Sequence, residues 1–86
     1  MISIQEKLFR EIKMIQEEVV LSSSIQNPDI KDLLYDVTYD AFFRIFELFD
    51  GYGNTELNLD IVDKFNNASI NKNCNLHDLC SKYLHN

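Results

Sequence analysis

The chain has 86 residues, which is enough for one hydrophobic core, and we expect a single domain over residues 1–86. Hydrophobic residues make up 45% of the chain, and it has only two Gly and one Pro, which is typical of a folded, helix-rich protein. Fourteen acidic and eight basic residues give a net charge of −6, which disfavours nucleic acid and anionic membranes and favours a protein partner with a basic surface.

A first helix is predicted from about residue 3 to residue 21. Ser3 and Glu6 are spaced as in a capping box, in which Ser3 accepts a backbone N–H and Glu6 reaches back to the cap. Apolar residues then recur at spacings of three and four, which places them on one face that Phe9 and Val20 widen: Ile4, Leu8, Ile12, Ile15 and Val19. The serines at 22–24 compete for backbone hydrogen bonds and favour a connection after this helix.

The longest apolar periodic segment runs from Pro28 to Asp50 and predicts one long helix, around which we expect the rest of the chain to pack. Asn27 is expected to cap it, and Gly51 to end it in a left-handed conformation. Its apolar face is predicted to consist of Ile30, Leu34, Val37, Ala41, Ile45 and Leu48, widened by Tyr35, Phe42, Phe46 and Phe49. A short connection between two amphipathic helices favours an antiparallel pair with the apolar faces together.

Two periodicities fit the segment from Glu56 to Asn71. Apolar residues from 57 to 61 alternate with polar ones as in a half-buried strand, and a turn at 65–68 would return the chain through Ile70. Leu57, Ile61 and Phe65 also fit a helix. We predict a short β-hairpin, with a helix as the alternative, because the Asn residues here weaken a helix.

A final helix is predicted after Asn75, which can cap it. Its apolar face is expected to hold Leu76, Leu79, Cys80, Tyr83 and Leu84 and to close the core. The predicted fold class is therefore α+β and mostly helical, with an antiparallel helical pair, a small β-hairpin and a closing C-terminal helix. The alternative is an all-α four-helix bundle.

Three short segments of the chain resemble a family of small uncharacterised bacterial proteins. They are the Asp50-Gly51 turn, the extended segment at 57–64 and the Leu76-His77-Asp78 start of the last helix. The resemblance covers the second half of the chain. It supports the hairpin there and implies no activity.

Both cysteines and both histidines lie in the last thirteen residues, at Cys74, His77, Cys80 and His85. Thiolate and imidazole are zinc ligands, but a structural zinc site usually takes ligand pairs from two separated segments, whereas this cluster is one local run. We therefore expect a buried Cys80, solvated histidines, and no metal or other cofactor. A zinc site, a Cys74–Cys80 disulfide and a Cys80 nucleophile beside His77 are the alternatives.

Acidic residues occupy the side of the long helix opposite its apolar face, at Asp29, Asp32, Asp36, Asp40, Glu47 and Asp50. Like charges four residues apart cost about 0.2–0.5 kcal/mol per pair in a helix, and Arg44 is the one basic residue close to them. The acidic stripe is either a solvated face or a docking face. The candidate partner-binding residues are Asp32, Asp36, Asp40, Phe43 and Glu47. Phe43 would be an exposed anchor, unless the last helix or another subunit covers it.

These observations predict a non-enzymatic protein–protein interaction domain, with an inhibitor or immunity-like role as one version. The alternative is a homodimeric structural or regulatory accessory protein. A homodimer is expected because about half the circumference of the long helix is apolar. One partner helix and a short closing helix would leave part of this apolar surface uncovered. No secretion signal and no membrane-spanning apolar run is found in the sequence, so we expect a cytoplasmic protein.

Overall fold

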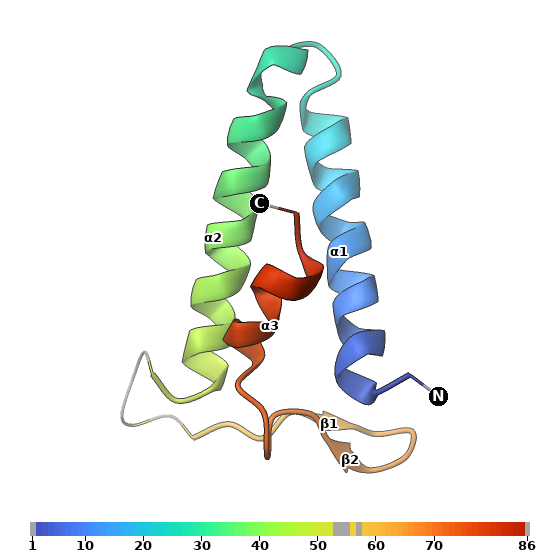
Figure 1. Ribbon diagram of the computed structural model, residues 1–86, viewed down its shortest axis with the longest axis vertical. Helices are drawn as coiled ribbons and strands as arrows, with labels where there is room; N and C mark the ends of the chain where they lie inside the picture. Colours follow the sequence, from blue (N-terminus) through green and yellow to red (C-terminus); the bar gives the residue numbers. More distant parts are fainter. Residues whose placement is uncertain (1, 53–55, 57, 86) are drawn as a thin grey trace.

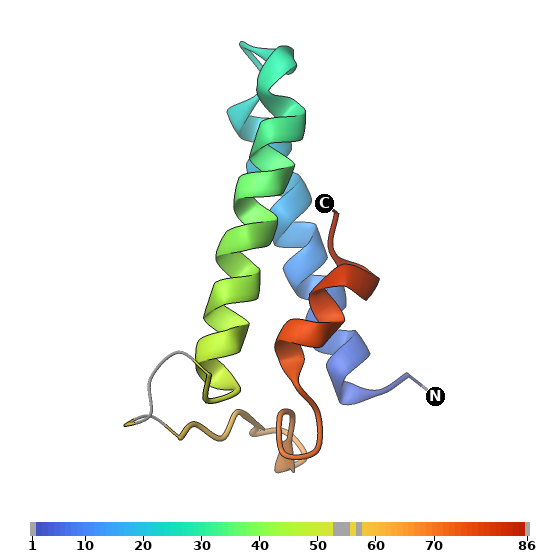
Figure 2. The same ribbon diagram turned by 60° about the vertical axis from the view of Figure 1, so that its left-hand side comes forward.

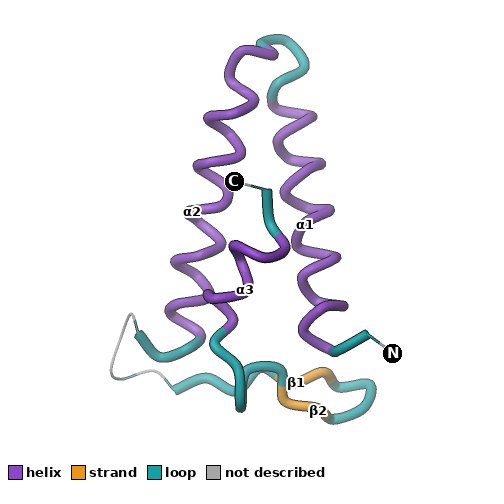
Figure 3. Tube along the Cα trace, in the orientation of Figure 1, coloured by secondary structure: helices purple, strands orange, loops and turns teal. Residues whose placement is uncertain are grey.

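The computed structural model describes residues 2–52, 56 and 58–85. Its helices are α1 (Ile4–Ser23), the short 3-10 helix η1 (Pro28–Ile30), α2 (Lys31–Phe49) and α3 (Leu76–Tyr83). The strands β1 (Val62–Asp63) and β2 (Ala68–Ser69) form a small antiparallel sheet (Figure 3). A mostly helical fold with a small sheet was predicted, and this is confirmed.

The two long helices run antiparallel, and α3 packs over one side of the pair (Figures 1 and 2). The β-hairpin lies at the end of the pair where α1 begins and α2 ends (Figure 1). The α1–α2 pair therefore has one side that α3 covers and an opposite side that α3 does not cover.

The helix ends follow the expected local chemistry in part. Ser3 accepts the backbone N–H of Glu6 at 3.0 Å, as the capping pattern predicted. Gly51 ends α2 with a φ of 91°, the left-handed conformation that glycine adopts without strain. The predicted Asn27 cap is wrong, because the Asn27 side chain makes no capping hydrogen bond and the helix begins with the 3-10 turn at Pro28–Ile30.

An aromatic cluster joins the three helices at the centre of the core. The ring of Phe9 on α1 lies 5.0 Å from the ring of Phe46 on α2 and 5.5 Å from that of Tyr83 on α3. The other members of the buried cluster are Ile70, Leu76, Cys80 and Leu84. The last helix therefore closes the core with the apolar face that its sequence predicted.

The apolar faces predicted for the long helices are wrong in part, because several of their members are exposed. Val37 and Ile45 on α2 are 55% and 46% exposed, and Ile15 and Val19 on α1 are 47% and 45% exposed. Of the residues predicted to widen these faces, Phe9 and Val20 on α1 and Tyr35 and Phe46 on α2 are buried, and so is Gln16, which was not predicted. Packing of α3 against one side of the pair moves the buried centre of each helix toward α3.

The hairpin was predicted in the right segment, but its first strand comes later than expected and its second strand begins within the predicted turn. Val62 pairs with Ser69 and Asp63 with Ala68, so the helix alternative is wrong for the described part of this segment. Asn67 takes a φ of 59° in the turn, a conformation that Asn tolerates better than most residues. Leu57, the first residue of the predicted alternation, lies outside the described residues.

A fully buried glutamine holds the chain after α3. Gln16 Nε2 donates to the His85 carbonyl at 2.6 Å, and Gln16 Oε1 accepts the His85 N–H at 2.9 Å. The same Nε2 lies 3.1 Å from Thr38 Oγ1 and 3.3 Å from the Tyr35 carbonyl. One side-chain amide on α1 therefore satisfies both backbone groups of His85, as a neighbouring strand would.

Replacing this amide should weaken the docking of α3. Gln16→Leu keeps the volume but leaves the His85 N–H and carbonyl without their partner, so we expect a loss of about 1–3 kcal/mol of unfolding free energy. Urea unfolding followed by circular dichroism measures this loss. Gln26→Leu, at an exposed position, is the matched control and should change stability by less than about 0.5 kcal/mol. Equal stability of the two variants would contradict the role given to Gln16.

Candidate functional site

The candidate residues of the acidic stripe lie on α2, but the stripe is shorter than the sequence predicted. Asp32, Asp36 and Asp40 are exposed, and Glu47 is half-buried. Asp40 Oδ2 accepts from Arg44 Nε at 3.0 Å on the solvent side. Asp50, predicted as the last member, is turned inward and buried, so the exposed part of the stripe ends before it.

Phe43 lies between the acidic stripe and α3, and it is half-buried. Its ring packs edge-on against the His77 ring at 5.5 Å and stacks with Tyr39 at 6.3 Å. These contacts cover part of the ring with α3. Phe43 therefore borders the acidic stripe and does not stand free at its centre.

A second surface comes from residues that the sequence assigned to the core. We call it the open face, and it consists of Ile15, Val19, Val37, Ala41 and Ile45, all of which are exposed. Around α2, the side of Phe43 meets α3 and the side of Phe46 meets α1. Ala41 and Ile45 lie further around the α2 axis, beyond the side that meets α1, and therefore point away from α3.

On α1, helical periodicity places the exposed Ile15 and Val19 on the same side as Ile4 and Leu8. Ile4 and Leu8 line a small cavity with Ile70 of the hairpin, so the hairpin covers the beginning of this apolar stripe. Ile15 and Val19 continue the stripe beyond the hairpin, at helical spacing. The open face is thus the uncovered continuation of a partly buried stripe.

Asp50 joins the end of α2 to the start of α3. Its side chain is 1% exposed, and its Oδ2 accepts the backbone N–H of His77 at 2.9 Å and the ring Nδ1 of His77 at 2.6 Å. The side chain of Asn75, the expected cap, makes no capping bond. Asp50 therefore caps α3 from the end of α2, and its negative charge is favourable at the positive end of the α3 dipole.

The prediction of solvated histidines is wrong for His77. Its side chain is only 12% exposed, with Nδ1 on Asp50 and Nε2 at 3.3 Å from Asp78 Oδ1. His85 is exposed, although its ring lies 3.9 Å from that of Tyr35. Sequence spacing gave no sign of the His77–Asp50 contact, because the two residues come from different helices.

The two cysteines are free thiols, and Cys80 is fully buried, as predicted. Burial, followed by the negative charge of Asp50, raises the pKa of the Cys80 thiol to about 11. Burial and the charges of Asp50 and Asp78 also raise the pKa of Cys74. A nucleophilic cysteine needs the opposite shift. Among the described residues, no three His, Cys, Asp or Glu side chains are grouped so that they could hold a metal ion.

Comparison with protein-family models, curated proteins and solved structures found no match to this chain. The resemblance to a family of small bacterial proteins stays a prediction. Within the described ranges, no helix combines the length and hydropathy that crossing a bilayer requires.

Removing the Asp50 carboxylate should loosen α3. Asp50→Ala deletes the cap and the partner of the His77 ring, and we expect it to lower the unfolding free energy by about 1–3 kcal/mol. Asp50→Asn keeps an acceptor oxygen and should lose less. Asp36→Ala, at an exposed carboxylate on the same helix, should stay within about 0.5 kcal/mol of the parent protein. Urea unfolding measures all three, and a loss no larger for Asp50→Ala than for Asp36→Ala would refute the capping role.

The buried Cys80 thiol should make stability depend on alkaline pH. Its folded pKa of about 11 lies above the ordinary value of 9.0, so its contribution is complete below pH 9 and is lost as pH rises through 11. The unfolding free energy of the parent protein should fall over this window more than that of Cys80→Ala. Alkylation by iodoacetamide at neutral pH should be slow at Cys80 in the folded protein. Rapid alkylation of Cys80 under native conditions would count against the assignment.

Proposed function

We propose that this protein is a non-enzymatic protein-binding domain whose open face receives a partner protein. The observation that carries the proposal is the exposure of Ile15, Val19, Val37 and Ile45 on one side of the two longest helices. Isolated exposed apolar residues are normal on any protein, but contiguous apolar surface rimmed by polar residues marks interaction sites. These four residues and Ala41 come from two adjacent helices, and helical periodicity places most of them on the side of the pair away from α3.

The charges around the open face define the chemistry of the partner. Glu11 and Glu18 flank it on α1, and the ion pair of Arg44 and Asp40 flanks it on α2. Asp36 lies one step further around α2, within the acidic stripe. A partner that presents an apolar surface, such as one side of an amphipathic helix, with Lys or Arg along its border would match both features. The net charge of −6 would steer such a basic partner toward the domain.

An inhibitor or immunity-like role in the cytoplasm is one version of this function. Such a protein would occupy a basic functional surface of its partner, with the acidic stripe aiding encounter and the open face slowing release. A homodimer through the open face is the alternative, because two α1–α2 pairs packed face to face would form a four-helix arrangement. The charge argument favours a different partner, since each copy of this chain carries −6.

Substitution on the open face tests the proposal once a partner has been isolated by co-purification at low salt and identified. We expect Ile45→Ser and Ile15→Ser to speed dissociation and weaken binding by about 30-fold, as loss of a central anchor does. Met14→Ser is the matched control, because Met14 is 54% exposed and lies on another side of α1. Surface plasmon resonance with the purified partner gives both rate constants.

The same measurement separates the roles of charge and apolar contact. Asp36→Lys with Asp40→Lys should slow association, and added salt should slow association of the parent protein. An affinity that is unchanged by Ile15→Ser and Ile45→Ser would refute the proposal. Light scattering that gives a dimer for the parent protein and a monomer for Ile45→Ser would replace it with the homodimer.

A further inference from the structure

The turn of the β-hairpin presents an aromatic side chain to solvent. Phe65 lies between β1 and β2 and is 96% exposed. Figure 1 shows this turn projecting sideways from the end of the helical pair, below the start of α1. Single exposed apolar residues are normal, but an aromatic ring on a projecting turn buries a large apolar area when a complementary pocket receives it. Phe65 is therefore available as an anchor for a contact between molecules.

Local hydrogen bonds fix the shape of this turn. Asp63 Oδ1 accepts the backbone N–H of Phe65 at 3.0 Å, and Asn66 Oδ1 accepts that of Ala68 at 3.3 Å. Both are Asx turns, and Asn67 in the second one takes a left-handed conformation with a φ of 59°. The backbone that carries the Phe65 ring is therefore ordered before any partner arrives, which lowers the entropy cost of binding.

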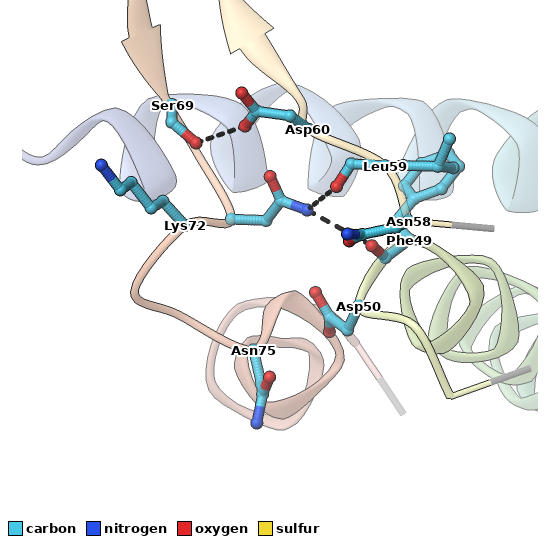
Figure 4. A pocket seen from close by; sticks show the side chains of 9 residues that line it. Phe49, Asp50, Asn58, Leu59, Asp60, Ser69, Lys72 and Asn75 are labelled. Carbon is cyan, nitrogen blue, oxygen red and sulfur yellow. Dashed lines mark hydrogen bonds between the residues drawn. The ribbon is translucent and has the colours of Figure 1, made fainter. Parts of the chain in front are cut away.

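The base of the hairpin is tied to both long helices. Gln5 Nε2 on α1 donates to the Ile70 carbonyl at 2.9 Å. Asn71 Nδ2 donates to the carbonyl of the last residue of α2 at 3.3 Å. Figure 4 shows Ser69 of β2 bonded to Asp60 in the segment before β1. The hairpin therefore keeps one orientation relative to α1, and its turn projects in a fixed direction.

An apolar cavity of about 280 Å³ lies beside the hairpin, at the start of α1. Its lining consists of Ile4, Lys7, Leu8, Asp63 and Ile70. This volume is smaller than most sites for drug-sized molecules and suits a single inserted side chain. Asp63 lines the cavity and lies two residues before Phe65, so the cavity and the exposed ring are close together on one molecule.

We propose that a second copy of this chain inserts its Phe65 ring into this cavity and receives the Phe65 ring of the first copy in return. The ring is 96% exposed, so it does not fill the cavity of its own molecule. Because ring and cavity belong to one end of the molecule, a two-fold axis between two copies can bring each ring to the cavity of the other. Such a contact is the same on both copies and closes at a dimer.

The charges around the ring and the cavity fit a second copy. Asp63 and Lys64 directly precede the ring, and Lys7 and Asp63 line the cavity. In the two-fold arrangement, the two lysines of one copy would face Asp63 of the other. The acidic stripe lies on α2, whereas ring and cavity carry two cations and one anion in each copy. This surface therefore does not itself repel a second copy, although the net charge of −6 opposes its approach at long range.

The buried area predicts weak and reversible association. A phenylalanine ring buries about 150–250 Å², so two rings and the cavity walls that they cover stay below the roughly 1,200 Å² of stable interfaces. We therefore expect a dissociation constant of about 100 μM. This inference does not depend on the proposed function, because it uses none of the residues of the open face.

Sedimentation velocity of the purified chain between about 10 μM and about 1 mM tests the proposal. Phe65→Ser should raise the dissociation constant of the dimer at least about tenfold, because it removes the anchor. Ile25→Ser is the matched control and should leave association unchanged, since Ile25 is 75% exposed and lies in the connection at the other end of the helical pair. Both positions are exposed, so both variants should fold, which circular dichroism verifies.

Two further measurements separate this dimer from the other contacts considered above. Ile45→Ser should leave association unchanged, whereas it would disrupt a dimer through the open face. Added salt should strengthen this dimer, because it screens the repulsion between two copies that each carry −6. Binding of a basic partner should respond to salt in the opposite direction.

Isotope-filtered NOE spectroscopy on a mixture of 13C-labelled and unlabelled chain identifies the contact itself. We expect cross-peaks between the Phe65 ring of one copy and the methyl groups of Ile4 and Leu8 of the other. Ile4→Trp, which fills the cavity, should abolish these cross-peaks and weaken association. If that variant does not fold, the cross-peaks of the parent protein still decide.

Three results would overturn the proposal. The first is a chain that stays monomeric at about 1 mM, roughly tenfold above the expected dissociation constant. The second is equal association of the parent protein and Phe65→Ser. The third is a set of Phe65 cross-peaks to Ile4 and Leu8 within one copy only, which would make the ring an occupant of its own cavity.

Discussion

The fold depends on two buried side chains that hold α3 at its two ends. Asp50, just past the end of α2, caps the first turn of α3, and Gln16 of α1 pairs with the backbone just after the last turn of α3. A helix of eight residues has no stability of its own in water. Each of these polar groups would be costly to bury without its partner, so α3 docks in one position only. The aromatic cluster of Phe9, Phe46 and Tyr83 forms only in that position.

Local signals in the sequence predicted the elements well, because those signals act within a few residues. The capping serine at Ser3 and the glycine at Gly51 marked real helix ends, and the hairpin was placed in the correct segment. The buried face of α3 was also predicted, because its apolar residues occupy a single side. Each of these features depends on neighbours along the chain.

The sequence could not predict which side of each long helix is buried. Both helices carry apolar residues over a wide arc of their circumference. Only one edge of each arc is buried, because α3 packs on one side of the helical pair. Most of the candidate acidic residues are exposed on α2, as periodicity predicted. Periodicity placed Asp50 in the acidic stripe as well. Asp50 lies just past the end of α2, however, where its side chain turns inward and contacts His77. That contact joins residues 27 positions apart, beyond the reach of any helical pattern.

The bond between Gln16 and His85 spans 69 residues, which is most of the chain. Closing so long a loop costs chain entropy that is recovered only when the contact and the core around it form together. During synthesis, α1 and α2 leave the ribosome well before His85, and until then Phe9, Gln16 and Phe46 lack their partners from the end of the chain. The nascent helical pair therefore exposes apolar surface on both of its sides, and this interval is when the protein is most exposed to aggregation and to chaperones.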